Sequence, residues 1–169
     1  MLHKQQIKIL IKEKNLLDDF IDLETQLTPN GFDITAAKIY SFQHAGSLDF
    51  SNKERIIPET QEVLPEKKSG EKYGWWQLSA GTYKIRSNET VSLPVNLVAF
   101  AFTRTSLLRM GVFTHHGVWD AGFCGKGEFI LIVANSDGVA IKQNARIAQL
   151  VFLPIEETEA YNGIFNNRS

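Results

Sequence analysis

Residues 28–42 read TPNGFDITAAKIYSF, a turn followed by a long run of strand-forming residues. The turn signal is Thr28-Pro29-Asn30-Gly31, because Pro and Gly both interrupt regular structure. From this point onward, short apolar runs rich in Val, Ile, Phe, Tyr and Trp are separated by Gly, Pro, Asn and Ser. Short β-prone runs bounded by turn-forming residues predict a mainly β protein.

The expected strands cover most of the chain after this turn. They are Phe32–Phe42, Tyr73–Leu78, Thr82–Ile85, Thr90–Leu93, Leu97–Phe102, Phe129–Ala134, Val139–Ile141 and Ile147–Leu153. Before the turn, apolar residues recur every three to four positions, which predicts one amphipathic helix within an N-terminal helical segment, residues 1–26. Its apolar positions are Ile7, Leu10, Ile11, Leu16, Leu17, Phe20 and Ile21.

The composition indicates one domain. The 169 residues are 43% apolar and 22% charged, enough for a single core. The 18 basic residues nearly balance the 19 acidic ones, and a net charge of -1 gives no long-range attraction to nucleic acid or an anionic membrane. No apolar run approaches the roughly 20 residues of a membrane span. The single cysteine, Cys124, excludes an internal disulfide, so we expect a cytoplasmic protein.

Two segments lie outside this regular pattern. Residues 51–70 are mainly charged and contain Pro58 and Pro65, which predicts a solvated polar insertion or an edge segment. Residues 161–169 hold Tyr161 and Phe165 among polar residues. They form either a frayed tail or a C-terminal arm that docks Phe165 on another surface.

Candidate phosphate ligands follow two of the expected strands. Arg104-Thr105-Ser106 offers a guanidinium beside two hydroxyls, groups that suit phosphate oxygens. The same tripeptide is common at helix starts, where Thr or Ser caps the backbone. Gln149 stands in an otherwise apolar strand, where its amide needs a partner, either a phosphate oxygen or a neighbouring backbone group.

A candidate catalytic acid lies between glycines. Asp120 is part of GVWDAG, residues 117–122, where the glycines permit a sharp turn and leave the carboxylate free to face a cleft. Such a group can accept a proton from an attacking water, although Asp between glycines is also a frequent turn former. His115 and His116 point to opposite faces of an extended segment, so a shared metal ion is not expected.

Four segments, in this order, resemble motifs of the dUTPase and dCTP deaminase superfamily. They are Leu27–Ile34 (LTPNGFDI), Leu93–Phe100 with Arg104–Gly111 (RTSLLRMG), Gly117–Phe123 (GVWDAGF) and Ala145–Leu150 (ARIAQL). The resemblance spans nearly the whole chain and is closest in character to short-tailed archaeal or viral dUTPases. It implies a distorted, jelly-roll-like β-barrel with the N-terminal helix, assembled as a homotrimer with nucleotide sites between subunits.

The resemblance also implies a division of labour among the candidate residues. The phosphate ligands would be Arg104, Thr105, Ser106 and Gln149. The pyrimidine and sugar would meet Thr114, His115, His116, Gly117 and Val118, largely through backbone groups. Asp120 would sit at the deoxyribose and orient the hydrolytic water, Phe165 would close the site, and Mg²⁺ would be held mainly by the phosphates.

The strand after Asp120 separates two activities of this superfamily. Deaminases resemble one another in a glutamate on this strand that shuttles protons at the pyrimidine ring. Two alignments place either Ile132 or Ile130 at that position, and an isoleucine cannot exchange protons. Glu128 is the one nearby acid, two residues before Ile130 and four before Ile132. An even displacement keeps its side chain on the same face of the strand.

The sequence therefore predicts a dUTP pyrophosphatase that produces dUMP and pyrophosphate. Hydrolysis needs an in-line water, charge neutralisation and a base, and no covalent nucleophile. One alternative is a dCTP deaminase, alone or coupled to hydrolysis. Another is a nucleotide-binding trimer without turnover.

Overall fold

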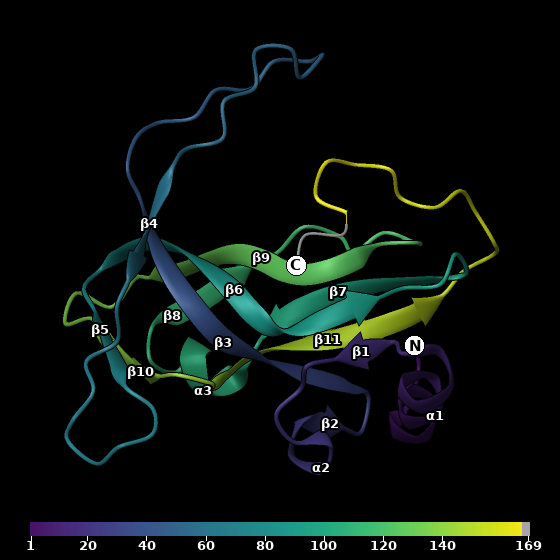
Figure 1. The fold of residues 1–169 in the computed structure, drawn as a ribbon, viewed down its shortest axis with the longest axis horizontal. Helices are drawn as coiled ribbons and strands as arrows, with labels where there is room; N and C mark the ends of the chain where they lie inside the picture. The colour runs from purple at the N-terminus through teal and green to yellow at the C-terminus, as the bar shows by residue number, and fades with distance from the viewer. Residues whose placement is uncertain (167–169) are drawn as a thin grey trace.

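A computed structural model describes residues 1–166 (Figure 1). The main sheet follows the spatial order β7 (Leu97–Thr103), β11 (Arg146–Pro154), β3 (Gly31–Phe42), β6 (Gly81–Ser92), β9 (Cys124–Val133) and β8 (Val112–His115). Three shorter strands attach to it, β1 (Leu17–Asp18), β2 (Leu27–Thr28) and β4 (Thr60–Val63). A separate antiparallel pair joins β5 (Trp75–Leu78) to β10 (Val139–Lys142).

The long strands curl around one core because their side chains alternate between two environments. In β6, Ile85, Ser87, Glu89 and Val91 are buried, and the residues between them are partly exposed. Strand β9 repeats the pattern, with every second residue from Gly125 to Val133 buried. This alternation turns one face of the sheet inward. The side chains of Phe32, Trp76, Leu131, Leu150 and Phe152, among others, fill the interior.

The sheet is nearly closed where β7 meets the segment that begins with β8. The Thr103 hydroxyl donates to the carbonyl of Thr114 at 3.0 Å and accepts from the Thr114 amide at 2.9 Å. A little further along, Ala99 and Trp119 exchange two backbone hydrogen bonds of 3.0 and 3.1 Å. The expected mainly β, barrel-like fold is therefore confirmed.

The N-terminal helix is shorter than the periodicity predicts. Helix α1 (Lys4–Lys14) buries Ile7 and Ile11, but it ends at Asn15, whose φ of 51° is left-handed. Leu17 then pairs with Val91 of β6, so the prediction of one helix continuing through Ile21 is wrong. Leu16 and Leu17 are buried at the start of this short strand, whereas Ile21 is exposed. Two further short helices follow, α2 (Leu23–Gln26) and α3 (Thr105–Leu108).

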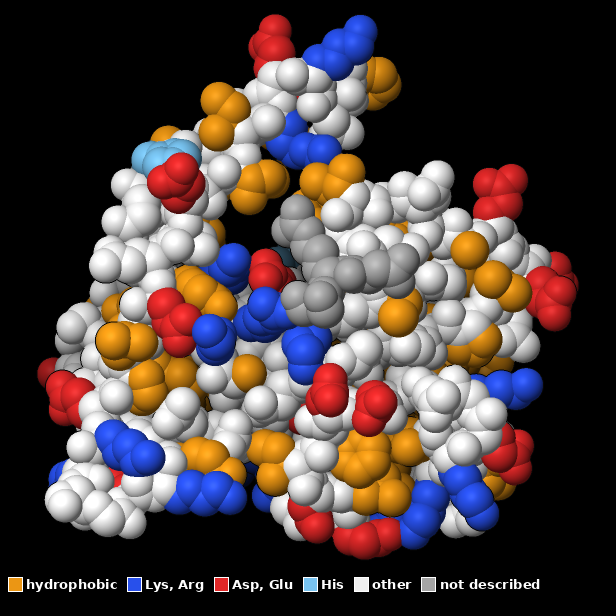
Figure 2. Space-filling view, viewed as in Figure 1, with side chains coloured by type: hydrophobic (Ala, Val, Ile, Leu, Met, Phe, Trp, Pro, Cys, Tyr) orange, Lys and Arg blue, Asp and Glu red, His pale blue; other side chains and the backbone are white. Residues whose placement is uncertain are grey.

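Two other expectations change in detail. The strands expected at residues 82–85 and 90–93 form one strand, β6, whose pairing with β9 shifts register between Arg86 and Thr90. Strand β4 lies inside the polar segment 51–70 and pairs with β3. The chain between β3 and β4 projects from the body (Figure 1). It contains Phe50, whose side chain is fully exposed. Figure 2 shows a hollow between this projection and the barrel.

Candidate functional site

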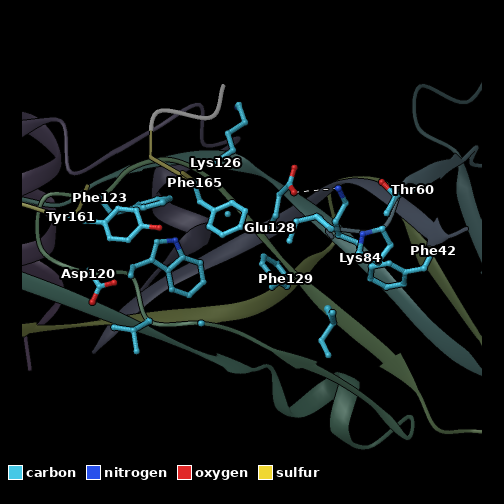
Figure 3. Close-up of a pocket in the computed structure, with 17 residues that line it drawn as sticks. Phe42, Thr60, Lys84, Asp120, Phe123, Lys126, Glu128, Phe129, Tyr161 and Phe165 are labelled. Carbon is cyan, nitrogen blue, oxygen red and sulfur yellow. Dashed lines mark hydrogen bonds and ion pairs between the residues drawn. The ribbon is translucent and has the colours of Figure 1, made fainter. Parts of the chain in front are cut away.

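A cavity of about 380 Å³ lies against the outer face of β6 and β9. Its aromatic lining is Phe42, Trp119, Phe123, Phe129, Tyr161 and Phe165, and its charged lining is Lys84, Asp120, Lys126 and Glu128 (Figure 3). Flat apolar walls with a few charged groups are typical of sites for small polar ligands. The segment before β4 contributes a further wall through Ile57 and Pro58.

Asp120 stands at one end of this cavity. The preceding residue, Trp119, is fixed by its bridge to Ala99, and Gly122 turns the chain with a φ of 78°. A side chain at Gly122 would collide with Ala160, so this turn also admits the C-terminal segment. The Asp120 carboxylate is exposed and accepts no hydrogen bond from residues 1–166. It is free to bind a water molecule or a ligand hydroxyl.

The wall beneath the cavity is the exposed face of β9. Lys126, Glu128 and Ile130 alternate with buried residues and line the cavity. Ile132 lies on the same face of the strand but outside the cavity. Glu128 Oε2 lies 3.2 Å from Lys84 Nζ on β6. Both positions expected for a proton-shuttling glutamate, Ile130 and Ile132, are apolar, and Glu128 lies two residues before Ile130 on the same face of the strand.

The predicted phosphate ligands gather elsewhere, where β7, β11 and β3 lie side by side. Arg104 Nε lies 2.9 Å from Asp33 Oδ2, and Gln149 donates to the Thr28 hydroxyl at 2.5 Å. This partner is a side-chain hydroxyl, not the neighbouring backbone group that was one of the two expectations; phosphate binding by Gln149 stays a prediction. Thr105 and Ser106 are exposed in α3. None of the four predicted phosphate ligands lines the cavity that contains Asp120.

Asp33 organises this second cluster, a role that sequence analysis missed. Its side chain is 4% exposed, and Arg146 Nη1 approaches the same oxygen as Arg104, at 3.2 Å. Burial raises the pKa of the Asp33 carboxyl, and the two guanidinium groups oppose that rise. An aspartate between apolar residues near the start of a strand was the available signal, but its partners are more than seventy residues away in sequence.

The predicted pyrimidine-binding residues divide into two sets. Gly117 and Val118 line the cavity, whereas Thr114 and His116 lie outside its lining and His115 is exposed. His116 Nε2 lies 2.8 Å from the Thr114 hydroxyl, and its ring packs 4.2 Å from that of Phe129. Burial lowers the pKa of His116 to about 4, and the nearby His115 contributes.

The C-terminal segment docks on the loop that carries Asp120. Tyr161 donates its amide to the carbonyl of Ala121 at 2.8 Å, and Asn166 accepts from the Cys124 amide at 2.8 Å. Tyr161 and Phe165 both line the cavity. The expected arm of residues 161–169 is therefore docked over its described part, while residues 167–169 lie outside the described residues. The role of Phe165 as a lid stays a prediction.

The helices and the potential metal ligands of residues 1–166 bear on two further kinds of site. No helix in this range is long and apolar enough to cross a membrane. The same residues contain no group of three or more His, Cys, Asp or Glu side chains placed to hold a metal ion.

The fold and site together define a barrel-like β protein with an aromatic, charged small-molecule cavity. Residues 1–155 match the family model described as dCTP deaminase-like, and the chain belongs to this family. The resemblance found in the motifs is thereby confirmed.

Named relatives and one solved structure extend the comparison. The chain is 40% identical to the probable deoxyuridine 5'-triphosphate nucleotidohydrolase of Methanosarcina mazei, over 100% of this chain and 98% of that protein. It is 33% identical to the deoxyuridine 5'-triphosphate nucleotidohydrolase of Methanocaldococcus jannaschii, over 92% and 95%. The structure of 2'-deoxycytidine 5'-triphosphate deaminase from Agrobacterium tumefaciens has a TM-score of 0.63 at 17% identity, covering 91% of this chain and 48% of that one. That likeness concerns the fold.

Proposed function

We propose that this protein hydrolyses dUTP to dUMP and pyrophosphate. The observation that carries the proposal is the pairing of an unbound carboxylate, Asp120, with the apolar Ile130 on the wall of one cavity. Asp120 can accept a proton from the attacking water, while the strand position associated with deamination has no ionisable group. The names of the archaeal relatives, which match over nearly their full lengths, support the same activity.

Asp120 orients the attacking water in this proposal. Attack at the α-phosphate needs a water in line with the leaving pyrophosphate and a base to accept its proton. The Asp120 carboxylate is exposed and has no competing partner in the described chain, so both oxygens are available. The bridge between Trp119 and Ala99 joins the backbone next to Asp120 to β7.

The triphosphate is bound by the second cluster, contributed by another copy of the chain. Arg104, Thr105, Ser106 and Gln149 lie outside the Asp120 cavity, so one chain does not bring base and phosphate ligands together. A homotrimer with sites between subunits would do so. Exposed apolar side chains on β7 support association: Phe102 is 62% exposed and Phe100 is 36% exposed.

Mg²⁺ accompanies the triphosphate in this scheme. It is a hard ion that takes oxygen ligands and keeps several waters. Phosphate oxygens and water can therefore supply most of its ligands. The free oxygens of Asp120 fit contact with such a hydrated ion. When bound, Mg²⁺ neutralises phosphate charge during the attack.

The base and sugar occupy the aromatic cavity. Gly117 and Val118 present backbone groups there, and Thr114, His115 and His116 support or flank that segment. Phe165 supplies a ring at the same cavity, where it closes over the bound nucleotide. Its position on the docked C-terminal segment supports this assignment.

The product assay is the test of this function. Purified protein with Mg²⁺ should convert dUTP to dUMP and pyrophosphate, and Asp120→Asn should lower the rate by about 10²–10⁴-fold. Asp137→Asn, which changes an exposed aspartate in the turn after β9, should retain wild-type turnover. An Asp120→Asn variant with undiminished pyrophosphate release would remove Asp120 from its role.

The alternatives give different products in the same assay. Conversion of dCTP to dUTP or dUMP would show deamination, with Glu128 the first residue to test. Tight binding of dUTP without pyrophosphate release would indicate a nucleotide-binding protein that lacks turnover. A stable, fully active monomer in sedimentation would refute the shared site.

A further inference from the structure

The ion pair between Lys84 and Glu128 crosses two neighbouring strands on the cavity wall. Lys84 Nζ lies 3.2 Å from Glu128 Oε2, and the two side chains are 24% and 33% exposed. Both residues line the cavity, and Figure 3 draws their ion pair as a dashed line. The pair presents one donor and one acceptor, side by side, to whatever flat ligand lies between the aromatic walls.

The strand register fixes the order of this donor and acceptor. In the β6–β9 ladder, Lys84 is opposite Ile130, whereas Glu128 is opposite Arg86. Lys84 therefore originates two residues further along β9 from the loop that holds Asp120. Figure 3 shows the same sequence across the cavity, with Asp120 first, then Glu128, then Lys84.

Uracil and cytosine differ at position 4, and their hydrogen-bond donors and acceptors follow opposite orders along the edge that leads away from the sugar. Counting away from the sugar, uracil offers a donor at N3–H and then an acceptor at O4. Cytosine offers an acceptor at N3 and then a donor at its amino group. A carboxylate followed by an ammonium matches uracil at both positions. With cytosine, the carboxylate would face the acceptor N3 and the ammonium would face the donor amino group, so neither hydrogen bond could form.

We propose that Glu128 and Lys84 read the pyrimidine edge, Glu128 accepting from N3–H and Lys84 donating to O4, and thereby select uracil over cytosine. This inference rests on the proposed function for its placement of the sugar near Asp120. It makes Glu128 a specificity-determining residue, with no proton transfer assigned to it.

Two neighbouring side chains on β9 do not compete with the pair. Lys126 Nζ lies 2.9 Å from Asp19 Oδ2 and also donates to the carbonyl of Asn88, so two of its three donors are already engaged. Ile130, opposite Lys84 in the ladder, is apolar and can only pack against the ring. The Lys84 ammonium also lies 4.7 Å from the centre of the Tyr40 ring, which helps to fix its position.

The test measures binding of dUMP and dCMP by calorimetry, because these ligands report base recognition without turnover. A hydrogen bond to a charged group is worth about tenfold or more in affinity. The wild type should therefore bind dUMP at least about tenfold more tightly than dCMP. Lys84→Met should reduce that ratio about tenfold, mainly by weakening dUMP. Glu128→Gln should also reduce it, because an amide can present either oxygen or nitrogen to N3.

A charge exchange provides the sharpest variant. Lys84→Glu combined with Glu128→Lys keeps an ion pair between β6 and β9 but reverses its order along the cavity. The preference should move toward dCMP. The matched control is the cross-strand pair Lys38–Glu62, separated by 2.8 Å and outside the cavity lining. Lys38→Met and Glu62→Gln should leave the dUMP-to-dCMP ratio unchanged.

The outcomes separate this inference from the proposed function. An unchanged ratio in folded Lys84→Met and Glu128→Gln, or equal weakening of both nucleotides, would overturn the reading of the base edge. So would a charge-exchanged protein that still prefers dUMP. If the ratios change as expected but dUTP is not hydrolysed, the base selection stands and the proposed catalysis fails. If dUTP is hydrolysed while the ratios stay constant, only the base selection fails.

Discussion

Acidification should destabilise the folded protein through one side chain, His116. Its imidazole packs against Phe129, and Nε2 lies 2.8 Å from the hydroxyl of Thr114. That hydroxyl in turn lies 3.0 Å from the hydroxyl of Thr103, which donates to the Thr114 carbonyl. The hydrogen-bond network therefore assigns a proton to Nε2 and leaves Nδ1 as an acceptor. Nδ1 is buried without a partner among residues 1–166, so a second proton there would have no acceptor.

The magnitude follows from the lowered pKa. Burial moves the pKa of His116 from 6.5 to about 4 in the folded state, so the unfolded state binds the proton first as pH falls. The stabilisation is complete above pH 6.5 and decreases as pH falls toward 4. The full difference corresponds to about 3 kcal/mol, at about 1.4 kcal/mol per pKa unit. About 2 kcal/mol of it should be lost by about pH 5.

Urea unfolding of the wild type and of His116→Gln at several pH values measures this effect. Glutamine can still donate to Thr114 but does not titrate, so the difference in unfolding free energy between the two proteins should shrink by about 2 kcal/mol from about pH 7.5 to about pH 5. His115→Gln controls for loss of the neighbouring, exposed imidazole. A difference between wild type and His116→Gln that stays constant with pH would refute the reasoning.

Three further predictions concern the second cluster and the metal ion. Asp33→Asn should lower the unfolding free energy by about 2 kcal/mol, less than the 3–5 kcal/mol typical of a fully buried pair because Arg104 and Arg146 are partly exposed; unchanged denaturant midpoints would contradict this. Arg104→Ala and Gln149→Ala should each weaken dUTP binding more than deoxyuridine binding, whereas equal losses would indicate damage to the fold. Removal of Mg²⁺ with a chelator should suppress dUTP hydrolysis and its re-addition should restore it; turnover that persists after chelation would exclude the ion from the reaction.

Local sequence signals were sufficient to predict most strands of the barrel, but not the end of helix α1 or the short strand β8. The turn at residues 28–31 precedes a real strand, β3, because the following β-branched and aromatic residues fit a pleated surface. Helix α1 was overextended because apolar spacing continues past Asn15, where only the left-handed backbone ends the helix. Strand β8 was missed because Val112–His115 has only two apolar residues at its start and is flanked by glycine.

The candidate site shows the same limit more clearly. The sequence identified Asp120, since its glycine-rich surroundings are local, and the structure places it at the cavity. Lys84 carried no such signal: its importance depends on the register between β6 and β9, which brings Lys84 beside Glu128, more than forty positions away. The convergence of Arg104 and Arg146 on Asp33 is equally non-local.

The junction between β7 and β8 gives the barrel a defined place to open. Its neighbours in the sheet are joined by continuous backbone ladders, whereas this junction relies on the hydroxyl of Thr103 and the bridge at Ala99. Few bonds must break there, so local opening requires less free energy than separating β3 from β6. The segment released is the one that carries the cavity wall from Gly117 to Asp120. Nucleotide entry can therefore be gated by a small excursion of this segment, which amide hydrogen exchange would detect while the remaining strands stay protected.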